Sequence, residues 1–192
     1  MMRLIAIWFA MALTVVAMRT HAAETTPGDS IYQLQMALTT QDDRAATLDV
    51  DRGHPVLITM FYGSCPYACP TLIHTMQRIE SKLDADQRGR LRALLVSIDP
   101  DRDTPAALAE VAKRHSADLS RWTFSRTSKE SVRQLAAVLG IQYRQLQGGG
   151  FNHSTIITLL DADGRIVAHT ARMTEIDEDF LAALRKTTAA IP

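Results

Sequence analysis

The sequence predicts an α/β domain in which helices cover both faces of a central mixed β-sheet. Three observations predict this fold. With 192 residues, the chain is long enough for one well-buried core and short for two domains. Apolar runs typical of buried strands alternate with segments whose apolar residues recur at helical spacing. Finally, one hairpin-like pair of segments precedes these alternating strands and helices and another follows them, and a last helix ends the chain.

The elements are expected in a definite order. Strands are predicted at 31–38, 46–50, 55–62, 91–98, 122–125, 154–160 and 165–170, with the first two forming an additional N-terminal hairpin. Helices are predicted at 70–83, 105–115, 128–139 and 175–188, and a glycine-rich loop at 147–153. Thr104 with Pro105 is a typical helix start, because threonine caps the helix and proline suits its first position.

Residues 1–23 are expected to be a secretory signal peptide, which leaves 24–192 as the folded domain. Arg3 provides a positive start, the fifteen residues 4–18 carry no charge, and Thr20 and Ala22 are small residues placed for cleavage. The alternative is a retained membrane anchor, although fifteen residues fall short of a membrane span. Export, in a bacterium to the periplasm, implies a compartment where disulfides can form.

The charge of the chain argues against several classes of partner. Without Arg3 and Arg19, 19 basic side chains remain against 21 acidic ones, and they form no basic run. Nucleic acid is therefore not an expected partner. No basic amphipathic helix is present that would bind a membrane surface, so membrane contact is expected only through an uncleaved N-terminal segment.

Cys65 and Cys69 are the only cysteines, and they lie where a buried strand is expected to give way to a helix. Residues four apart share a helix face, so both sulfurs are expected to point the same way. The positive end of the helix dipole predicts a lowered pKa for both thiols, which favours redox chemistry or metal binding. A merely structural disulfide is the less favoured interpretation, because so short a loop gains only about 2 kcal/mol from closure.

Other uses of the pair fit the sequence less well. A peroxiredoxin has Thr or Ser three residues before its reactive cysteine, where this chain has Tyr62. A structural zinc site needs four ligands, usually from two ligand pairs, and only one pair exists. Two thiolates and one imidazole suit copper, especially Cu(I). A redox-active cysteine pair remains the alternative.

His153 is the candidate third ligand. The other histidines of residues 24–192 are expected in ordinary surface or core positions; they are His54, His74, His115 and His169. His153 instead ends the glycine-rich loop and directly precedes a predicted buried strand. In thioredoxin-like folds the loop before this penultimate strand lies beside the cysteine turn.

Three motifs resemble the signature blocks of the Sco (SenC) family: Cys65-Pro-x-x-Cys69-Pro, the segment VSIDPDRDTP at 96–105, and His153-Ser154. The resemblance covers about residues 30–185. It implies a thioredoxin-like, copper-binding accessory protein outside the bacterial cytoplasm that helps to assemble the dinuclear copper centre of cytochrome c oxidase. It also implies that Cys65, Cys69 and His153 are the copper ligands.

Two positions depart from the family pattern. Tyr67 and Asn152 stand where many members have aspartate. Carboxylates orient ligands and favour the more highly charged Cu(II), so we expect weaker Cu(II) binding with the three ligands intact. The protein that receives the copper can therefore also be another copper enzyme. Alternatively, the function of this chain can be a redox reaction.

Two further segments have structural interpretations beside functional ones. Residues 99–105 have the turn and cap chemistry of a strand-to-helix junction, while Asp101 and Asp103 could also shape a surface for a partner. The glycines at 148–150 are expected to make the loop mobile, so that His153 can close over a metal.

Two functions follow from the sequence. One is an exported copper metallochaperone that delivers the metal to a respiratory enzyme subunit or another exported copper protein. The other is an exported thiol–disulfide oxidoreductase, with Cys65 and Cys69 as its redox-active pair, that reduces cysteines of a copper-protein partner. His153 discriminates between them, because copper needs a third ligand and disulfide exchange does not.

Overall fold

A computed structural model describes residues 26–65 and 68–190 of the chain; the predicted signal peptide and Tyr67 lie outside these ranges. The strands are β1 (Ala37–Thr40), β2 (Ala45–Thr47), β3 (Val56–Phe61), β4 (Arg92–Ser97), β5 (Trp122–Arg126), β6 (Tyr143–Gln145), β7 (Phe151–His153), β8 (Ile157–Leu160) and β9 (Ile166–Thr170). The helices are α1 (Ala68–Glu80), α2 (Ala85–Arg90), α3 (Pro105–Arg114), α4 (Lys129–Val138) and α5 (Glu178–Ala189), preceded by a 3₁₀ turn at Ile31–Leu34.

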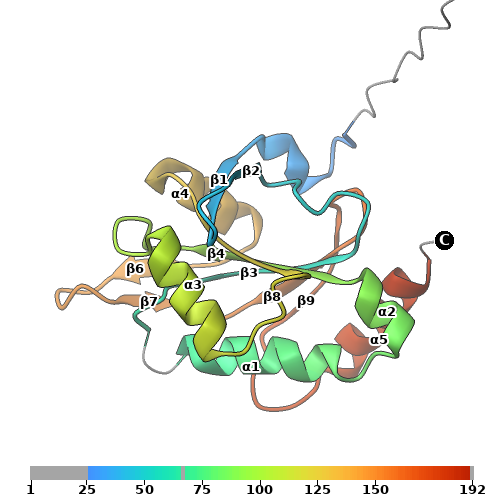
Figure 1. Cartoon of the computed structure of the whole chain (residues 1–192). Coiled ribbons are helices and arrows are strands. Elements are labelled where there is room, and N and C mark those ends of the chain that lie inside the picture. Colours follow the sequence, from blue (N-terminus) through green and yellow to red (C-terminus); the bar gives the residue numbers. More distant parts are fainter. Residues whose placement is uncertain (1–25, 66–67, 191–192) are drawn as a thin grey trace, which may run out of the picture.

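Seven strands form one mixed sheet in the order β2-β1-β5-β4-β3-β8-β9 (Figure 1). Strands β3, β4 and β5 run parallel, while β8 pairs antiparallel with β3 and then with β9. The N-terminal hairpin β1–β2 joins the sheet through antiparallel pairing of β1 with β5. Helices α1 and α4 lie on opposite sides of the sheet (Figure 1). The predicted thioredoxin-like fold with an additional N-terminal hairpin is therefore confirmed.

The core is centred on β3, whose six residues are all buried. Helix α1 packs its apolar stripe against the sheet; the stripe consists of Leu72, Ile73, Met76 and Ile79. No helix among the residues that the structure describes is both long and apolar enough to cross a bilayer.

Several predicted boundaries were wrong for local reasons. Residues 31–34 form a 3₁₀ turn and not a strand, because the Ser30 hydroxyl accepts the Tyr32 N–H and caps the turn. Helix α2 was missed, although Asp84 and Gln87 form a capping box at its start. The predicted loop at 147–153 is largely a second hairpin, β6–β7, and β8 begins three residues later than expected.

The loop after β3 is held by a buried carboxylate from the next strand-to-helix junction. Asp103 is only 3% exposed and accepts hydrogen bonds from the Gly63 N–H, at 2.9 Å, and from the Ser97 hydroxyl. A Cβ atom at Gly63 would lie 2.7 Å from Asp103 Oδ1 and 3.3 Å from a methyl group of Val111. Glycine is therefore needed here for close approach of the backbone to Asp103.

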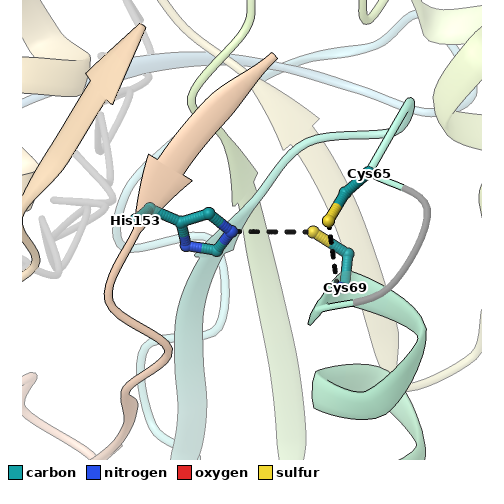
Figure 2. Close-up of side chains that lie close together, drawn as sticks. All are labelled: Cys65, Cys69 and His153. Carbon is teal, nitrogen blue, oxygen red and sulfur yellow. Dashed lines mark hydrogen bonds between the residues drawn. The ribbon is translucent and has the colours of Figure 1, made fainter. Parts of the chain in front are cut away.

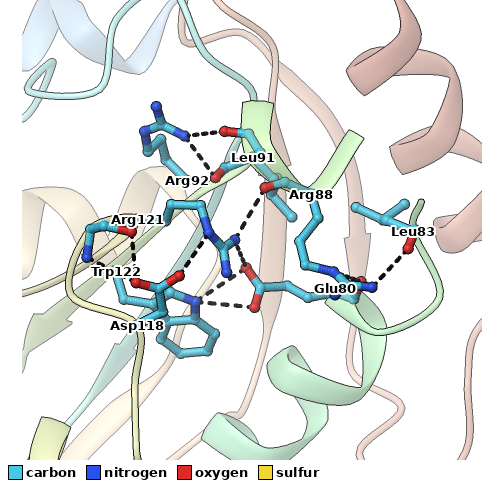
Figure 3. Close-up of polar contacts among 10 residues, drawn as sticks. Glu80, Leu83, Arg88, Leu91, Arg92, Asp118, Arg121 and Trp122 are labelled. Atoms are coloured by element: carbon cyan, nitrogen blue, oxygen red, sulfur yellow. Dashed lines mark hydrogen bonds and ion pairs between the residues drawn. The ribbon is translucent and has the colours of Figure 1, made fainter. Parts of the chain in front are cut away.

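The far end of α1 is fixed by a buried ionic network (Figure 3). The Glu80 carboxylate accepts hydrogen bonds from the Arg121 guanidinium at 2.9 Å and from the Trp122 indole N–H at 3.1 Å. Arg121 also pairs with the exposed Asp118 at 3.1 Å. Burial raises the pKa of Glu80, and Arg121 opposes that shift. The network joins the C-terminal turn of α1 to the start of β5, so the helix is attached at the end opposite Cys69.

We predict that Gly63→Ala destabilises the protein by about 1–3 kcal/mol, because the new methyl group overpacks against Asp103 and Val111. Gly89→Ala is the matched control. Gly89 lies in α2, and a methyl group added there would meet no atom within 4 Å, so alanine should stabilise the helix by up to about 1 kcal/mol. Urea unfolding of both variants tests the difference, and equal stabilities would contradict it.

We predict that Glu80→Ala lowers the free energy of unfolding by about 1–3 kcal/mol, because it leaves the buried Trp122 indole N–H without its acceptor and removes the more buried of the two carboxylates that pair with Arg121. The control is Asp118→Ala, which removes the other carboxylate of Arg121. The Asp118 side chain is 51% exposed, and its loss should cost about 1 kcal/mol or less. Chemical denaturation measures both, and similar losses would show that Glu80 has no special role.

Candidate metal centre

Three side chains from separate segments meet beyond the carboxyl end of β3 (Figure 2). Cys65 lies in the loop after β3, Cys69 is the second residue of α1, and His153 is the last residue of β7. One sulfur or nitrogen atom from each lies within 4.8 Å of the other two. Among the described residues, no other three His, Cys, Asp or Glu side chains come together in this way. The structure thus brings together the three site residues predicted from sequence.

Both cysteines are thiols. The loop after β3 brings Cys65 next to Cys69, so the two sulfurs do not lie along one helix face. Cys65 precedes α1, so the expected arrangement of both residues on one helix was wrong. The Cys69 N–H at the start of the helix donates to Cys65 Sγ at 3.3 Å (Figure 2). The Tyr62 N–H donates to Cys69 Sγ at 3.4 Å. Each sulfur therefore accepts a backbone hydrogen bond, and such bonds favour the charged thiolate form.

The expected lowering of the thiol pKa does not hold for Cys69. Burial raises the pKa of this thiol, and the backbone hydrogen bond from Tyr62 opposes the shift only in part. Cys69 is 3% exposed, so removal of water from the sulfur outweighs the positive end of the helix. A bound cation would supply the missing stabilisation, because metal coordination deprotonates a thiol outright.

The orientation of His153 leaves one ring nitrogen free to coordinate. Nδ1 lies 3.1 Å from the Ser154 carbonyl oxygen, which can only accept a hydrogen bond. Nδ1 therefore carries the proton, and Nε2 presents its lone pair toward Cys69 Sγ at 3.9 Å. Burial also lowers the pKa of His153, which favours the neutral ring. A neutral imidazole with its second nitrogen hydrogen-bonded is the form that binds metals.

The three donors fit a soft metal ion. With metal–sulfur and metal–nitrogen bonds of about 2.3 and 2.0 Å, donors at 120° lie about 3.7 Å apart. The observed separation of 3.9 Å between Cys69 Sγ and His153 Nε2 is close to that value. Two sulfurs and one imidazole are the donors that Cu(I) prefers. On the outside, His153, Asn152 and Arg144 line an open hollow of about 460 Å³, so one side of His153 faces solvent.

The other histidines lie elsewhere, as expected. His74 is exposed on α1, and His115 caps the end of α3. His54 lies 3.3 Å from Arg92, and His169 lies 2.9 Å from the Thr158 hydroxyl. None of them reaches the cysteines within the described part of the chain.

Residues 99–105 have a role at the site that sequence reasoning missed. Asp103 is buried under the cysteine loop, so it does not contribute to a docking surface as suggested, whereas Asp101 is exposed and pairs with Lys129. Asp99 pairs with Arg102, and Arg102 donates to the carbonyl of Gly149 in the turn of the β6–β7 hairpin. The segment therefore holds both the cysteine loop and the hairpin that carries His153. Nothing in the sequence pattern signalled these contacts, because they join segments 40 and 47 residues apart.

Comparison with known proteins places the chain in a family. Residues 24–189 match the family model described as SCO1/SenC. A SCO2-like protein of Rickettsia typhi is 30% identical over 124 residues, which are 62% of this chain and 59% of that protein. The chain thus spans about three-fifths of the length of that relative.

Solved structures share the fold. The structure of ScoI from Bradyrhizobium japonicum with copper bound has a TM-score of 0.66 at 23% identity, covering 79% of this chain and 96% of that one. BsSco, described with a disulfide switch and as a member of the Sco family of cytochrome c oxidase assembly proteins, has a TM-score of 0.68 at 19% identity, covering 80% and 91%. With the family model matched over nearly the whole described chain, this protein belongs to the SCO1/SenC family.

Proposed function

We propose that this protein is an exported copper metallochaperone that binds one copper ion through Cys65, Cys69 and His153 and transfers it to a partner. The observation that carries the proposal is the convergence of two sulfurs and one imidazole nitrogen within 4.8 Å. The copper-bound structure of a family member, ScoI of Bradyrhizobium japonicum, supports copper as the metal.

The site suits Cu(I) in particular. Soft sulfur ligands favour this ion, and burial of Cys69 limits the negative charge that can form there without a cation. Binding displaces both thiol protons. Cu(I) offsets one of the two thiolate charges, and the backbone N–H groups of Tyr62 and Cys69, which donate to the sulfurs, help to stabilise the other. Asn152, exposed beside His153, adds no charge to attract Cu(II).

The arrangement also suits transfer of the metal. The ligands come from a loop, a helix start and a hairpin, and the hollow beside His153 gives a partner access to that ligand from outside. Three protein ligands leave a soft ion open to a fourth, incoming ligand, and this allows ligand exchange without release of free copper. We propose a respiratory copper enzyme such as cytochrome c oxidase as the recipient, and the description of BsSco supports this choice. Another exported copper protein would satisfy the same chemistry.

A second function is favoured by the two thiols lying together. Reduction of a partner's disulfide would transfer two electrons and two protons from Cys65 and Cys69 and leave a Cys65–Cys69 disulfide. An exported thiol reductant would then have to restore the pair. The disulfide switch described for BsSco supports this alternative. The two functions exclude each other at any one moment, since an oxidised pair cannot supply two thiolates.

We predict that His153→Ala lowers Cu(I) affinity at least 10- to 100-fold, because loss of a direct ligand should cost no less than loss of an outer hydrogen-bond partner. The thiol–disulfide midpoint should move much less, since it depends on thiolate character and access. The experiment pairs a Cu(I) competition titration with a glutathione redox titration. His74→Ala, an exposed histidine on the same helix as Cys69, is the control, and oxidised protein should bind no copper at this site.

The opposite pattern would favour the second function. If His153→Ala leaves copper affinity unchanged and shifts the redox midpoint strongly, His153 tunes the cysteines of an oxidoreductase and is not a ligand. Equal copper affinity of reduced and oxidised wild-type protein would place the metal away from Cys65 and Cys69.

We further propose that the protein is exported and matures by cleavage after the predicted signal peptide. The support is the positively charged start, the short apolar run and the small residues before Ala23. Mass spectrometry of protein from its native host should find a mature N-terminus at Ala23 or Glu24. Full-length protein recovered only with the membrane fraction would instead show a retained anchor.

A further inference from the structure

Tyr62 contacts the immediate surroundings of all three candidate ligands. It directly follows β3 and is 6% exposed. Its carbonyl oxygen accepts the Cys65 N–H at 3.2 Å, and its N–H donates to Cys69 Sγ at 3.4 Å. Its ring meets the His153 ring edge-on, with centroids 5.7 Å apart. The backbone of this residue therefore holds the cysteine loop, while its side chain extends to the hairpin that carries His153.

The side chain of Tyr62 attaches to that hairpin at a defined point. Its hydroxyl donates to the Phe151 carbonyl oxygen at 3.1 Å, two residues before His153 on β7. Its ring also packs against the Phe151 ring, with centroids 5.4 Å apart. The β6–β7 hairpin forms a separate two-stranded sheet, and a ribbon of this size is only marginally stable by itself. Its position relative to the cysteines thus depends on side-chain contacts of this kind.

We propose that Tyr62 is a positioning residue that sets the distance between His153 and the two thiols. The proposal rests on the metal site described above. The hydroxyl contributes to this positioning because it donates a hydrogen bond to the backbone of β7. The bond therefore holds the strand itself and does not depend on the conformations of the hairpin side chains. The ring alone can pack in several orientations, whereas the hydrogen bond selects one. Loss of the hydroxyl should leave the fold intact and let Nε2 of His153 move away from the sulfurs.

The first test needs no metal. Tyr62→Phe removes only the hydroxyl, and Tyr143→Phe is the matched control. The Tyr143 ring packs on Phe151 from the other strand of the hairpin, and its hydroxyl makes no hydrogen bond with the described residues. Amide hydrogen exchange across residues 143–153 should become about 2- to 10-fold faster in Tyr62→Phe and stay unchanged in Tyr143→Phe. Unchanged exchange in both variants would overturn the proposal, whatever the protein binds.

The second test measures Cu(I) affinity in wild type, Tyr62→Phe, His153→Ala and the double variant. Tyr62→Phe should lower affinity about 10-fold, as expected for a residue that orients a ligand. In the His153→Ala background the same change should have almost no further effect, because Tyr62 acts through His153. The Tyr62 hydroxyl also interacts with the Cys65 side chain. The glutathione redox midpoint of the cysteine pair should nevertheless change much less than the copper affinity, since the backbone bonds of Tyr62 remain.

The outcomes separate this inference from the proposed function. Equal copper affinity of wild type and His153→Ala would defeat the ligand assignment, and the exchange experiment would still decide whether Tyr62 holds the hairpin. If His153→Ala loses affinity and Tyr62→Phe does not, the site stands and the positioning role is wrong. An equal loss from Tyr62→Phe with and without His153 would also overturn it, because Tyr62 would then act on the cysteines.

Discussion

The antiparallel pairing of β3 with β8 is the constraint on which the site depends. Ile58 pairs with Thr158, and the Thr59 hydroxyl donates to the Ile156 carbonyl at 2.7 Å. In this register the end of β3 lies beside the start of β8. The cysteine loop leaves β3 there, and the segment from His153 enters β8 there, so residues 84 positions apart in sequence become neighbours. A slip of one residue would turn the side chains of β8 to the opposite face and displace that segment.

Burial gives the site its chemical character. The Cys69 thiol is buried and His153 is half-buried, so the pKa of the thiol rises while that of the imidazole falls. Both shifts favour neutral groups in the absence of a cation. A soft cation reverses the balance for the thiol, because its charge replaces the solvation that burial removed. The backbone donors of Tyr62 and Cys69 support the same thiolate form from the protein side.

Contacts outside the three candidate ligands hold the parts of the site in place. Asp103 holds the cysteine loop through Gly63, and Arg102 contacts the hairpin turn at Gly149. The network around Glu80 attaches α1 at its far end. Only the hairpin with His153 lies outside the main sheet, in a sheet of its own, among the strands of the described residues. The two cysteines thus lie next to the main sheet. His153 lies in a separate hairpin that is held against the rest of the domain mainly by side-chain contacts.

The sequence by itself determined the architecture and singled out the three candidate site residues. Apolar runs and helical spacing predicted the alternating strands and helices, because burial imposes those periods wherever a segment faces the core. Cys65, Cys69 and His153 could be chosen because thiols and imidazole are chemically distinctive and their neighbours form recognisable motifs.

Only the tertiary structure decided how the candidate site is arranged and buried. The direction of the Cys69 pKa shift depends on burial, and burial depends on packing by segments distant in sequence. The hairpin around residues 147–153 was missed because its strands are three residues each, too short to show an alternating pattern. The contacts of Tyr62, Asp103 and Arg102 were likewise invisible, since a hydrogen bond between remote segments leaves no periodic trace in either one.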